Sequence, residues 1–179
     1  GVVAVLRCAL DQPVERVTIS GRFQRVHPLD VEKAVREAVG TDGMVAVDLE
    51  RIAEAVQRIP WVDRASVART WPRALSVQVV EQVPVARWGE SGLLNVRGEV
   101  FVHDPRHIPP ELPELSGPEG QQALMTERYL ATAPRLTEAG MRLARMTLDE
   151  RGAWELALAN GVVLRLGREQ VEERFERFI

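Results

Sequence analysis

Hydrophobic positions in the first 60 residues alternate in one segment and recur at helical spacing in two others. The segment VERVTISG (14–21) is rich in β-branched residues and ends at a glycine, which predicts a strand. In LDVEKAVREAVG (29–40) the apolar residues share one helical face before Gly40, a common helix C-cap. A second helix is predicted after Asp48, a favourable N-cap, and Pro60 should end it.

The segment from residue 60 to residue 81, PWVDRASVARTWPRALSVQVVE, contains two runs in which apolar and polar side chains alternate. Ala65 and Val67 share one face of the first run, and the second run alternates in the same way. Trp61 and Trp71 precede the two runs and are expected to pack at the sheet margins, with partner contact as the less favoured alternative. The order strand, helix, helix, strand, strand predicts an α+β sandwich of two helices on a small sheet.

The middle of the chain predicts short strands followed by a long helix. Apolar residues on both sides of the turn NVRGE (95–99) predict two short strands, and a proline-rich loop is expected at 105–118. GQQALMTERYLATAPRLTEAG (120–140) is helical in composition, although Pro134 should kink or split the helix.

The last 40 residues predict a strand, a hairpin and a helix. MRLARMTLD (141–149) alternates imperfectly and is expected to be a strand. Asn160-Gly161 lies between two alternating runs and predicts a hairpin with a type I′ turn. In REQVEERFERFI (168–179) the apolar residues lie on one helical face.

Composition indicates a folded protein and narrows the class of partner. Hydrophobic residues make up 45% and charged residues 27% of the 179 positions, as in ordinary globular proteins. The net charge of -3 and a pI near 5.7 argue against nucleic acid as a partner. No apolar run reaches the length of about 18 residues that is typical of a membrane-spanning helix.

Candidate catalytic and metal-binding groups are few. His103 and His107 have a spacing that could bind a metal on a helix, but Pro105 lies between them and no third ligand is near. Cys8 is the only cysteine and lies near one end, outside the predicted elements. GPEG (117–120) lacks the glycine spacing of a phosphate-binding loop. We therefore expect no enzyme activity, no metal site and no cofactor.

Several motifs resemble the FtsQ family of bacterial cell-division proteins, called DivIB in Gram-positive bacteria. The first half contains VERVTISGRF, a helix that ends in IPWV, the turn SVARTWP and the exit VVEQVPVARW. In the second half, LLNVRGEVF, PELPELSGPEG and WELALANGVVLRLGREQVEERFERF are similar to later segments of the family. The resemblance extends from about residue 14 to the last residue.

The resemblance implies an α+β protein of two domains. A POTRA domain with the order β-α-α-β-β is expected at residues 13–84, after a membrane-proximal tail at residues 1–12. A mostly antiparallel, FtsQ-type β domain with flanking helices is expected at residues 85–179. This domain is expected to be C-terminally incomplete, because the family continues with further strands after the matching helix.

The resemblance also implies a non-enzymatic scaffold of the divisome. The chain would be the periplasmic part of a bitopic, single-pass inner-membrane protein at the midcell division site, anchored through a helix upstream of this chain. FtsB and FtsL are the expected partners, and the expected role is to recruit and regulate septal peptidoglycan synthesis. In the family, FtsB adds a strand to the last strands of the β domain, which is a form of β-augmentation.

Candidate partner-binding residues combine predicted exposure with position in the family. In the POTRA domain they are Arg64, Val67 and Arg69 on the first hairpin strand and Leu49 at the start of the second helix. Val67 and Leu49 also fit the core pattern. In the second domain they are Arg151 and Trp154. Arg151 resembles a family arginine that pairs with an acidic residue of FtsB, and it precedes the strand that begins near Trp154.

Two alternatives remain open. A POTRA-containing module of an outer-membrane assembly or secretion system would have repeated POTRA units, and the different second half argues against it. An envelope hydrolase would require a pocket with converging polar groups and shifted pKa values.

Overall fold

A computed structural model describes residues 11–102, 106 and 108–179. Residues 1–10 of the expected membrane-proximal tail (1–12) therefore lie outside the described residues. Cys8, His103 and His107 also lie outside them. The chain divides into two compact units, of which the first ends at Gln82 and the second begins at Val83.

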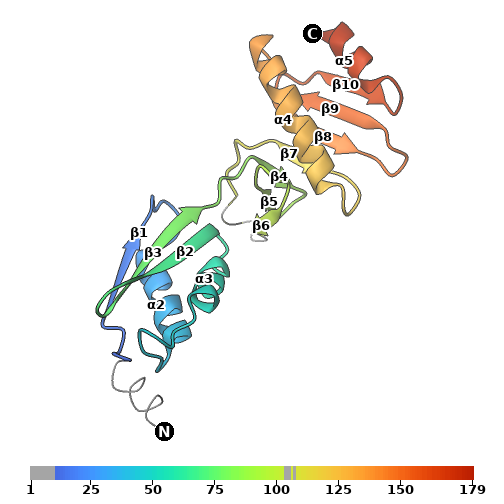
Figure 1. The fold of residues 1–179 in the computed structure, drawn as a ribbon. Coiled ribbons are helices and arrows are strands. Elements are labelled where there is room, and N and C mark those ends of the chain that lie inside the picture. The colour runs from blue at the N-terminus through green and yellow to red at the C-terminus, as the bar shows by residue number, and fades with distance from the viewer. Residues whose placement is uncertain (1–10, 103–105, 107) are drawn as a thin grey trace. The chain divides into compact units, whose positions relative to one another are not determined.

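Within residues 11–82, the first unit has two helices packed on a three-stranded sheet (Figure 1). Its elements are β1 (Arg16–Ser20), α2 (Pro28–Val39), α3 (Leu49–Gln57), β2 (Val62–Thr70) and β3 (Ala74–Glu81). The strand order is β1-β3-β2, with β1 parallel and β2 antiparallel to the central β3. The predicted order of strands and helices is confirmed.

Local signals explain where these helices begin and end. The Asp48 carboxylate accepts hydrogen bonds from the backbone N–H groups of Glu50 and Arg51, at 3.0 and 3.1 Å, and so caps α3. Gly40 ends α2 with a φ of 57°, a conformation that glycine adopts without steric cost. The apolar faces of both helices and of β3 form one buried core, so each element contributes the face that its periodicity predicted.

The second unit contains a seven-stranded sheet with the order β10-β9-β8-β7-β4-β5-β6 (Figure 1). Its strands are β4 (Ala86–Trp88), β5 (Gly92–Leu94), β6 (Val100–Val102), β7 (Glu114–Ser116), β8 (Leu143–Leu148), β9 (Trp154–Leu158) and β10 (Val163–Gly167). Pairings of β4 with β7 and of β7 with β8 are parallel, whereas the other four are antiparallel. The predicted α+β class and mostly antiparallel second unit are confirmed.

Two helices flank this sheet. Helix α4 (Gln122–Glu138) packs on β7 and β8, and α5 (Val171–Phe178) packs on β10. Met125 and Leu136 of α4 and Phe175 of α5 enter the same buried core.

The middle of this unit differs from the sequence-based prediction. Strand β7 lies inside the segment expected to be a proline-rich loop, and β4 was not predicted. Both strands have three residues, which is too short for alternation to be recognised. They are strands because β4 pairs with β5 and β7, and β7 pairs with β8, and these pairings join distant segments of the chain.

Helix α4 is continuous through Pro134, so the expected split did not occur. Pro134 is exposed, as is Leu130, whose carbonyl loses its usual helical donor at this position. A carbonyl on the solvent side can bond to water, which reduces the cost of a proline inside a helix.

The hairpin of β9 and β10 was predicted correctly, but its turn type was wrong. A type I′ turn requires positive φ at both central residues, and Gln170 is the only non-glycine with positive φ among the described residues. Gly161 has a φ of 89°, its N–H donates to the carbonyl of Leu158, and the N–H of Leu158 donates to the carbonyl of Val162. The connection is therefore a three-residue loop with Gly161 in the bulge position.

Candidate functional site

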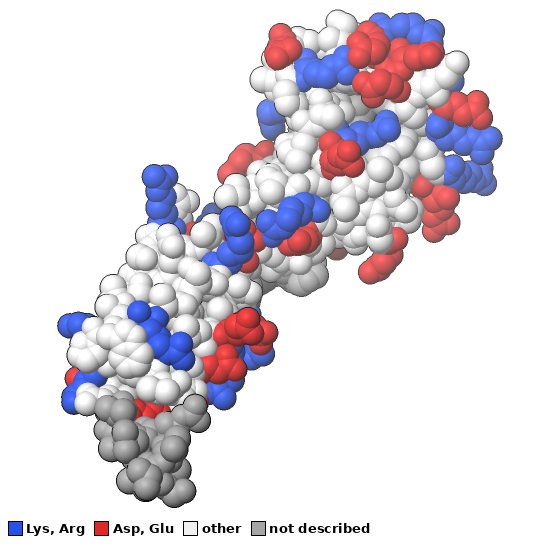
Figure 2. Space-filling model, in the orientation of Figure 1, with Lys and Arg blue, Asp and Glu red and all other residues white. Residues whose placement is uncertain are grey.

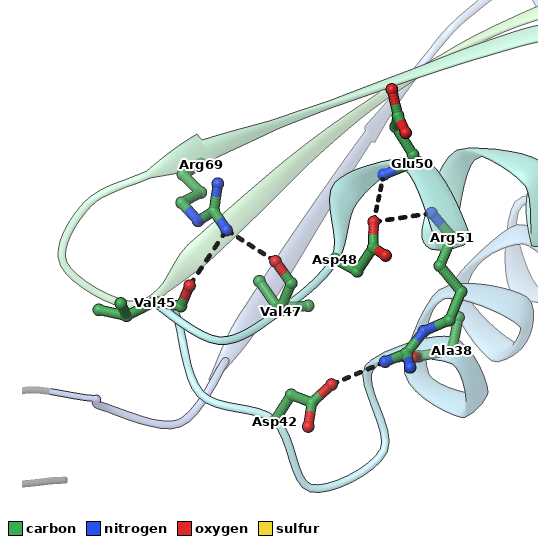
Figure 3. A network of polar contacts seen from close by, with 8 residues as sticks. All are labelled: Ala38, Asp42, Val45, Val47, Asp48, Glu50, Arg51 and Arg69. Carbon is green, nitrogen blue, oxygen red and sulfur yellow. Dashed lines mark hydrogen bonds and ion pairs between the residues drawn. The ribbon is translucent and has the colours of Figure 1, made fainter. Parts of the chain in front are cut away.

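A hollow of about 660 Å³ lies between α2 and α3 of the first unit. On its wall, the Arg51 guanidinium donates to the Asp42 carboxylate at 2.7 Å and to the carbonyl of Ala38 at 2.9 Å (Figure 3). These bonds join the end of α2 to the start of α3, so they stabilise the helix pair. The wall is otherwise built largely from small residues such as Ala34 and Ala55.

The described ranges contain no group of three or more His, Cys, Asp or Glu side chains that could hold a metal ion. Within the same ranges, no helix is both long and apolar enough to cross a bilayer.

Shifted pKa values arise from local partners or from burial. Hydrogen bonds from Arg97, and then from Asn95, lower the pKa of Glu99 to about 2. Burial raises the pKa of Tyr129. A hydrogen bond to Glu176, followed by one to Glu172, raises the pKa of Arg135 and joins α4 to α5.

Strand β2 forms one edge of the first sheet, so among the described residues its outer backbone groups have no neighbouring strand. Such an edge can accept a strand from a partner. Arg64 lies on this strand with 75% of its side chain exposed, and its Nε atom is 3.6 Å from the Asp63 carboxylate. Val67 is half-buried and packs on the core, as its alternative assignment predicted.

Arg69, near the end of β2, forms hydrogen bonds with the loop that precedes α3 (Figure 3). Its Nε atom donates to the carbonyl of Met44 at 2.6 Å, and Nη2 donates to Val47 at 2.7 Å and to Val45 at 3.4 Å. The guanidinium therefore binds the loop that leads into α3. Leu49, the first residue of α3, is half-buried against the same core.

Arg151 lies exposed in the turn between β8 and β9. The Asp149 carboxylate accepts the backbone N–H groups of Arg151 and Ala153, both at 2.8 Å, and the Asp149 carbonyl accepts the N–H of Gly152 at 3.0 Å. These bonds satisfy the backbone of the turn, whereas the Arg151 guanidinium forms no ion pair with any described residue. The turn thus presents a cation on a hydrogen-bonded backbone.

Trp154, the neighbouring candidate, belongs to the core. Its exposed fraction is 7%, and the Arg128 guanidinium of α4 lies 4.5 Å from the centre of its ring. The indole therefore joins β9 to α4, and Arg128 covers it from solvent. Of the six candidates, Arg64 and Arg151 alone combine an exposed position with an accessible charge.

Strand β10 is an exposed edge that sequence analysis did not select. It pairs with β9 and forms one border of the seven-stranded sheet within the described residues. Val163 is 50% exposed and Val162, just before the strand, is 41% exposed. Alternation predicted the strand but does not show whether a strand is central or at an edge. The sequence did contain one signal for an edge position: the predicted strand is followed directly by a helix and not by another hairpin strand.

The two hairpin tryptophans of the first unit differ from each other. Trp61 packs on the core as expected, with the Arg25 guanidinium 5.0 Å from its ring centre. Trp71 is 61% exposed, so the expectation that it packs at the sheet margin was wrong.

Charged side chains of both signs are interspersed on the face drawn in Figure 2. Neither unit presents a broad basic surface there, which agrees with the net charge of -3. Selective contacts would therefore depend on individual charges and strand edges.

Comparison with family models matches both units. Residues 86–179 match the family model described as cell division protein FtsQ/DivIB, C-terminal. Residues 12–82 match the model of the FtsQ-type POTRA domain.

Several curated proteins named cell division protein FtsQ are similar to the chain over 93% of its length. The protein of Xanthomonas campestris pv. campestris is 36% identical, that of Allochromatium vinosum 35% and that of Shewanella oneidensis 38%. The chain spans 59%, 67% and 63% of the lengths of these relatives, respectively.

Proposed function

The chain belongs to the FtsQ/DivIB family of cell division proteins, as its motifs predicted, and from this premise we propose that it is a non-enzymatic scaffold of the divisome. The POTRA domain would comprise residues 13–84 and the β domain residues 85–179. Both would lie in the periplasm at midcell, held by a single inner-membrane helix upstream of this chain, with residues 1–12 next to the membrane. FtsQ-type matches in both units leave the outer-membrane secretion alternative without support.

We propose FtsB and FtsL as the partners, and recruitment and regulation of septal peptidoglycan synthesis as the role. The observation that supports this best is Arg151, an exposed cation on a turn whose backbone is held by Asp149. An acidic side chain of FtsB would pair with it, and a pre-ordered turn loses little conformational entropy on binding. Arg64 on the β2 edge is a second candidate contact, for a partner of the POTRA domain.

Calorimetric titration tests this proposal directly. The extracytoplasmic segment of the cognate FtsB is titrated into the protein at its natural length, and saturable binding in a simple ratio is expected. Arg151→Glu should weaken the affinity about tenfold or more, because it replaces an attractive pair by a repulsive one.

Arg142→Glu is the matched control. Arg142 is also exposed, but it precedes β8 at the end opposite to Arg151. Equal losses in both variants would indicate a general charge effect and would remove Arg151 from the site. A folded protein that binds no FtsB would contradict the scaffold proposal itself.

A further inference from the structure

Three segments meet at the end of the first unit that contains residue 11, through which the chain enters the fold. They are residues 11–16, the loop 43–47 and the hairpin turn 69–73, and we call them together the entry end. The carbonyl of Gln12 accepts the N–H of Met44 at 2.8 Å, and the carbonyl of Arg73 accepts the N–H of Glu15 at 2.9 Å. Arg69 adds its bonds to the carbonyls of the loop (Figure 3), and together these bonds connect the three segments.

Most charged side chains of the entry end already have partners within it. Arg73 pairs with Glu15 and also donates to Gln12. Asp11 accepts the N–H of Val45 at 2.6 Å. Arg16 is exposed, but it is a cation, which a phospholipid surface accepts. The entry end can therefore approach headgroups without stripping water from an unpaired carboxylate.

Three apolar side chains of the entry end face solvent. Trp71 is 61% exposed and Val45 is 46% exposed, and Pro72 next to the tryptophan is also exposed. Tryptophan has a large apolar ring and one N–H donor, a combination that favours the boundary between water and hydrocarbon. Burying this ring in a membrane interface would remove its apolar surface from water and leave the N–H hydrated.

We propose that the entry end rests on the lipid bilayer, with the Trp71 ring at the level of the headgroups. This inference rests on the proposed function, which places a membrane helix upstream. That helix would join the first unit through residue 11, which lies at the entry end. A tether in the same chain raises the effective concentration of the bilayer near the entry end, so one weak contact is enough to restrict the tumbling of the first unit.

Fluorescence quenching in membranes tests the contact. The protein at its natural length is reconstituted into phosphatidylcholine–phosphatidylglycerol vesicles that contain lipids with a doxyl quencher near the headgroup. Wild-type fluorescence should be quenched, and Trp71→Phe should lose this quenched component. Trp61→Phe, which changes a tryptophan packed on the core, is the matched control and should retain it.

The outcomes separate this inference from the proposed function. Equal quenching of wild type and Trp71→Phe, in protein that stays with the membrane, overturns the lipid contact alone. Protein that does not stay with the membrane overturns the proposed anchor and the inference with it. If Trp71 becomes shielded from aqueous acrylamide only when a partner protein is added, its contact is with protein, and the lipid proposal is wrong.

Discussion

The end of strand β2 and the turn between β8 and β9 each carry an arginine that sequence analysis selected for partner binding. At the end of β2, Arg69 donates to the carbonyls of Met44, Val45 and Val47. In the β8–β9 turn, Arg151 is exposed, and Asp149 already satisfies the surrounding backbone N–H groups.

The difference lies in what the fold places opposite each side chain. A loop with free carbonyls binds a nearby guanidinium, because buried or half-buried carbonyls require donors. Where an aspartate already accepts the backbone N–H groups of a turn, the arginine side chain of that turn remains available to a partner. Exposed arginines on such turns are therefore better candidates for partner binding than arginines at strand ends that face loops.

The largest effect on stability is expected for Trp154, which follows the Arg151 turn. Trp154→Ala should lower the free energy of unfolding by about 3–5 kcal/mol, because it leaves a cavity between β9 and α4. Trp71→Ala, at an exposed position, should change it by less than about 0.5 kcal/mol. Urea denaturation followed by circular dichroism measures both, and similar losses would show that the contrast between them is wrong.

Arg69→Met tests whether this arginine is structural. It keeps much of the aliphatic stem but removes the donors to the α2–α3 loop, which should cost about 1–3 kcal/mol of stability. Arg64→Met on the same strand changes an exposed side chain and should be nearly neutral. Chemical denaturation of the two variants gives the comparison, and a neutral Arg69→Met would return Arg69 to the list of contact residues.

Asp149→Ala tests whether the Arg151 turn is held by the aspartate. It removes two hydrogen bonds to backbone N–H groups in a solvent-accessible turn, so a loss of about 1 kcal/mol is expected. Arg151→Glu should leave stability within about 0.5 kcal/mol, since this guanidinium has no ion pair among the described residues. Thermal unfolding measures both, and marked destabilisation by Arg151→Glu would indicate a structural role.

The smallest effect is a pH dependence at Glu99, another turn carboxylate. Its pKa is lowered from 4.5 to about 2, so between these values the unfolded chain binds more protons than the folded one. Stability from Glu99 is therefore present above pH 4.5 and is lost as the pH falls toward 2. It should amount to about 0.2–1 kcal/mol, because the Arg97 and Glu99 side chains are 47% and 58% exposed.

Glu99→Gln provides the comparison for this effect. The difference in melting temperature between wild type and Glu99→Gln should shrink as the pH is lowered through this window. A constant difference would contradict the assignment to the Glu99 charge.

Much of the first unit was predictable because its elements are long enough to show their period. The caps at Asp48 and Gly40 and the alternation in β2 and β3 placed its five elements in the observed order. In the second unit, β4 and β7 have three residues each, and their identity as strands depends on pairing with distant segments. Of the candidate residues, Arg64 and Arg151 lie on the surface as expected, whereas Arg69 donates to a loop carbonyl and Trp154 is buried beside Arg128.

The amino-acid sequence by itself determined the α+β class, the order of the main elements, the helix caps and the membership of the FtsQ/DivIB family. Only the tertiary structure decided that β10 is an exposed edge, that Trp154 is buried and that Trp71 is not. The reason is physical. Periodicity and capping depend on residues within a few positions of one another, whereas burial and edge position depend on which distant segments pack against a given side chain.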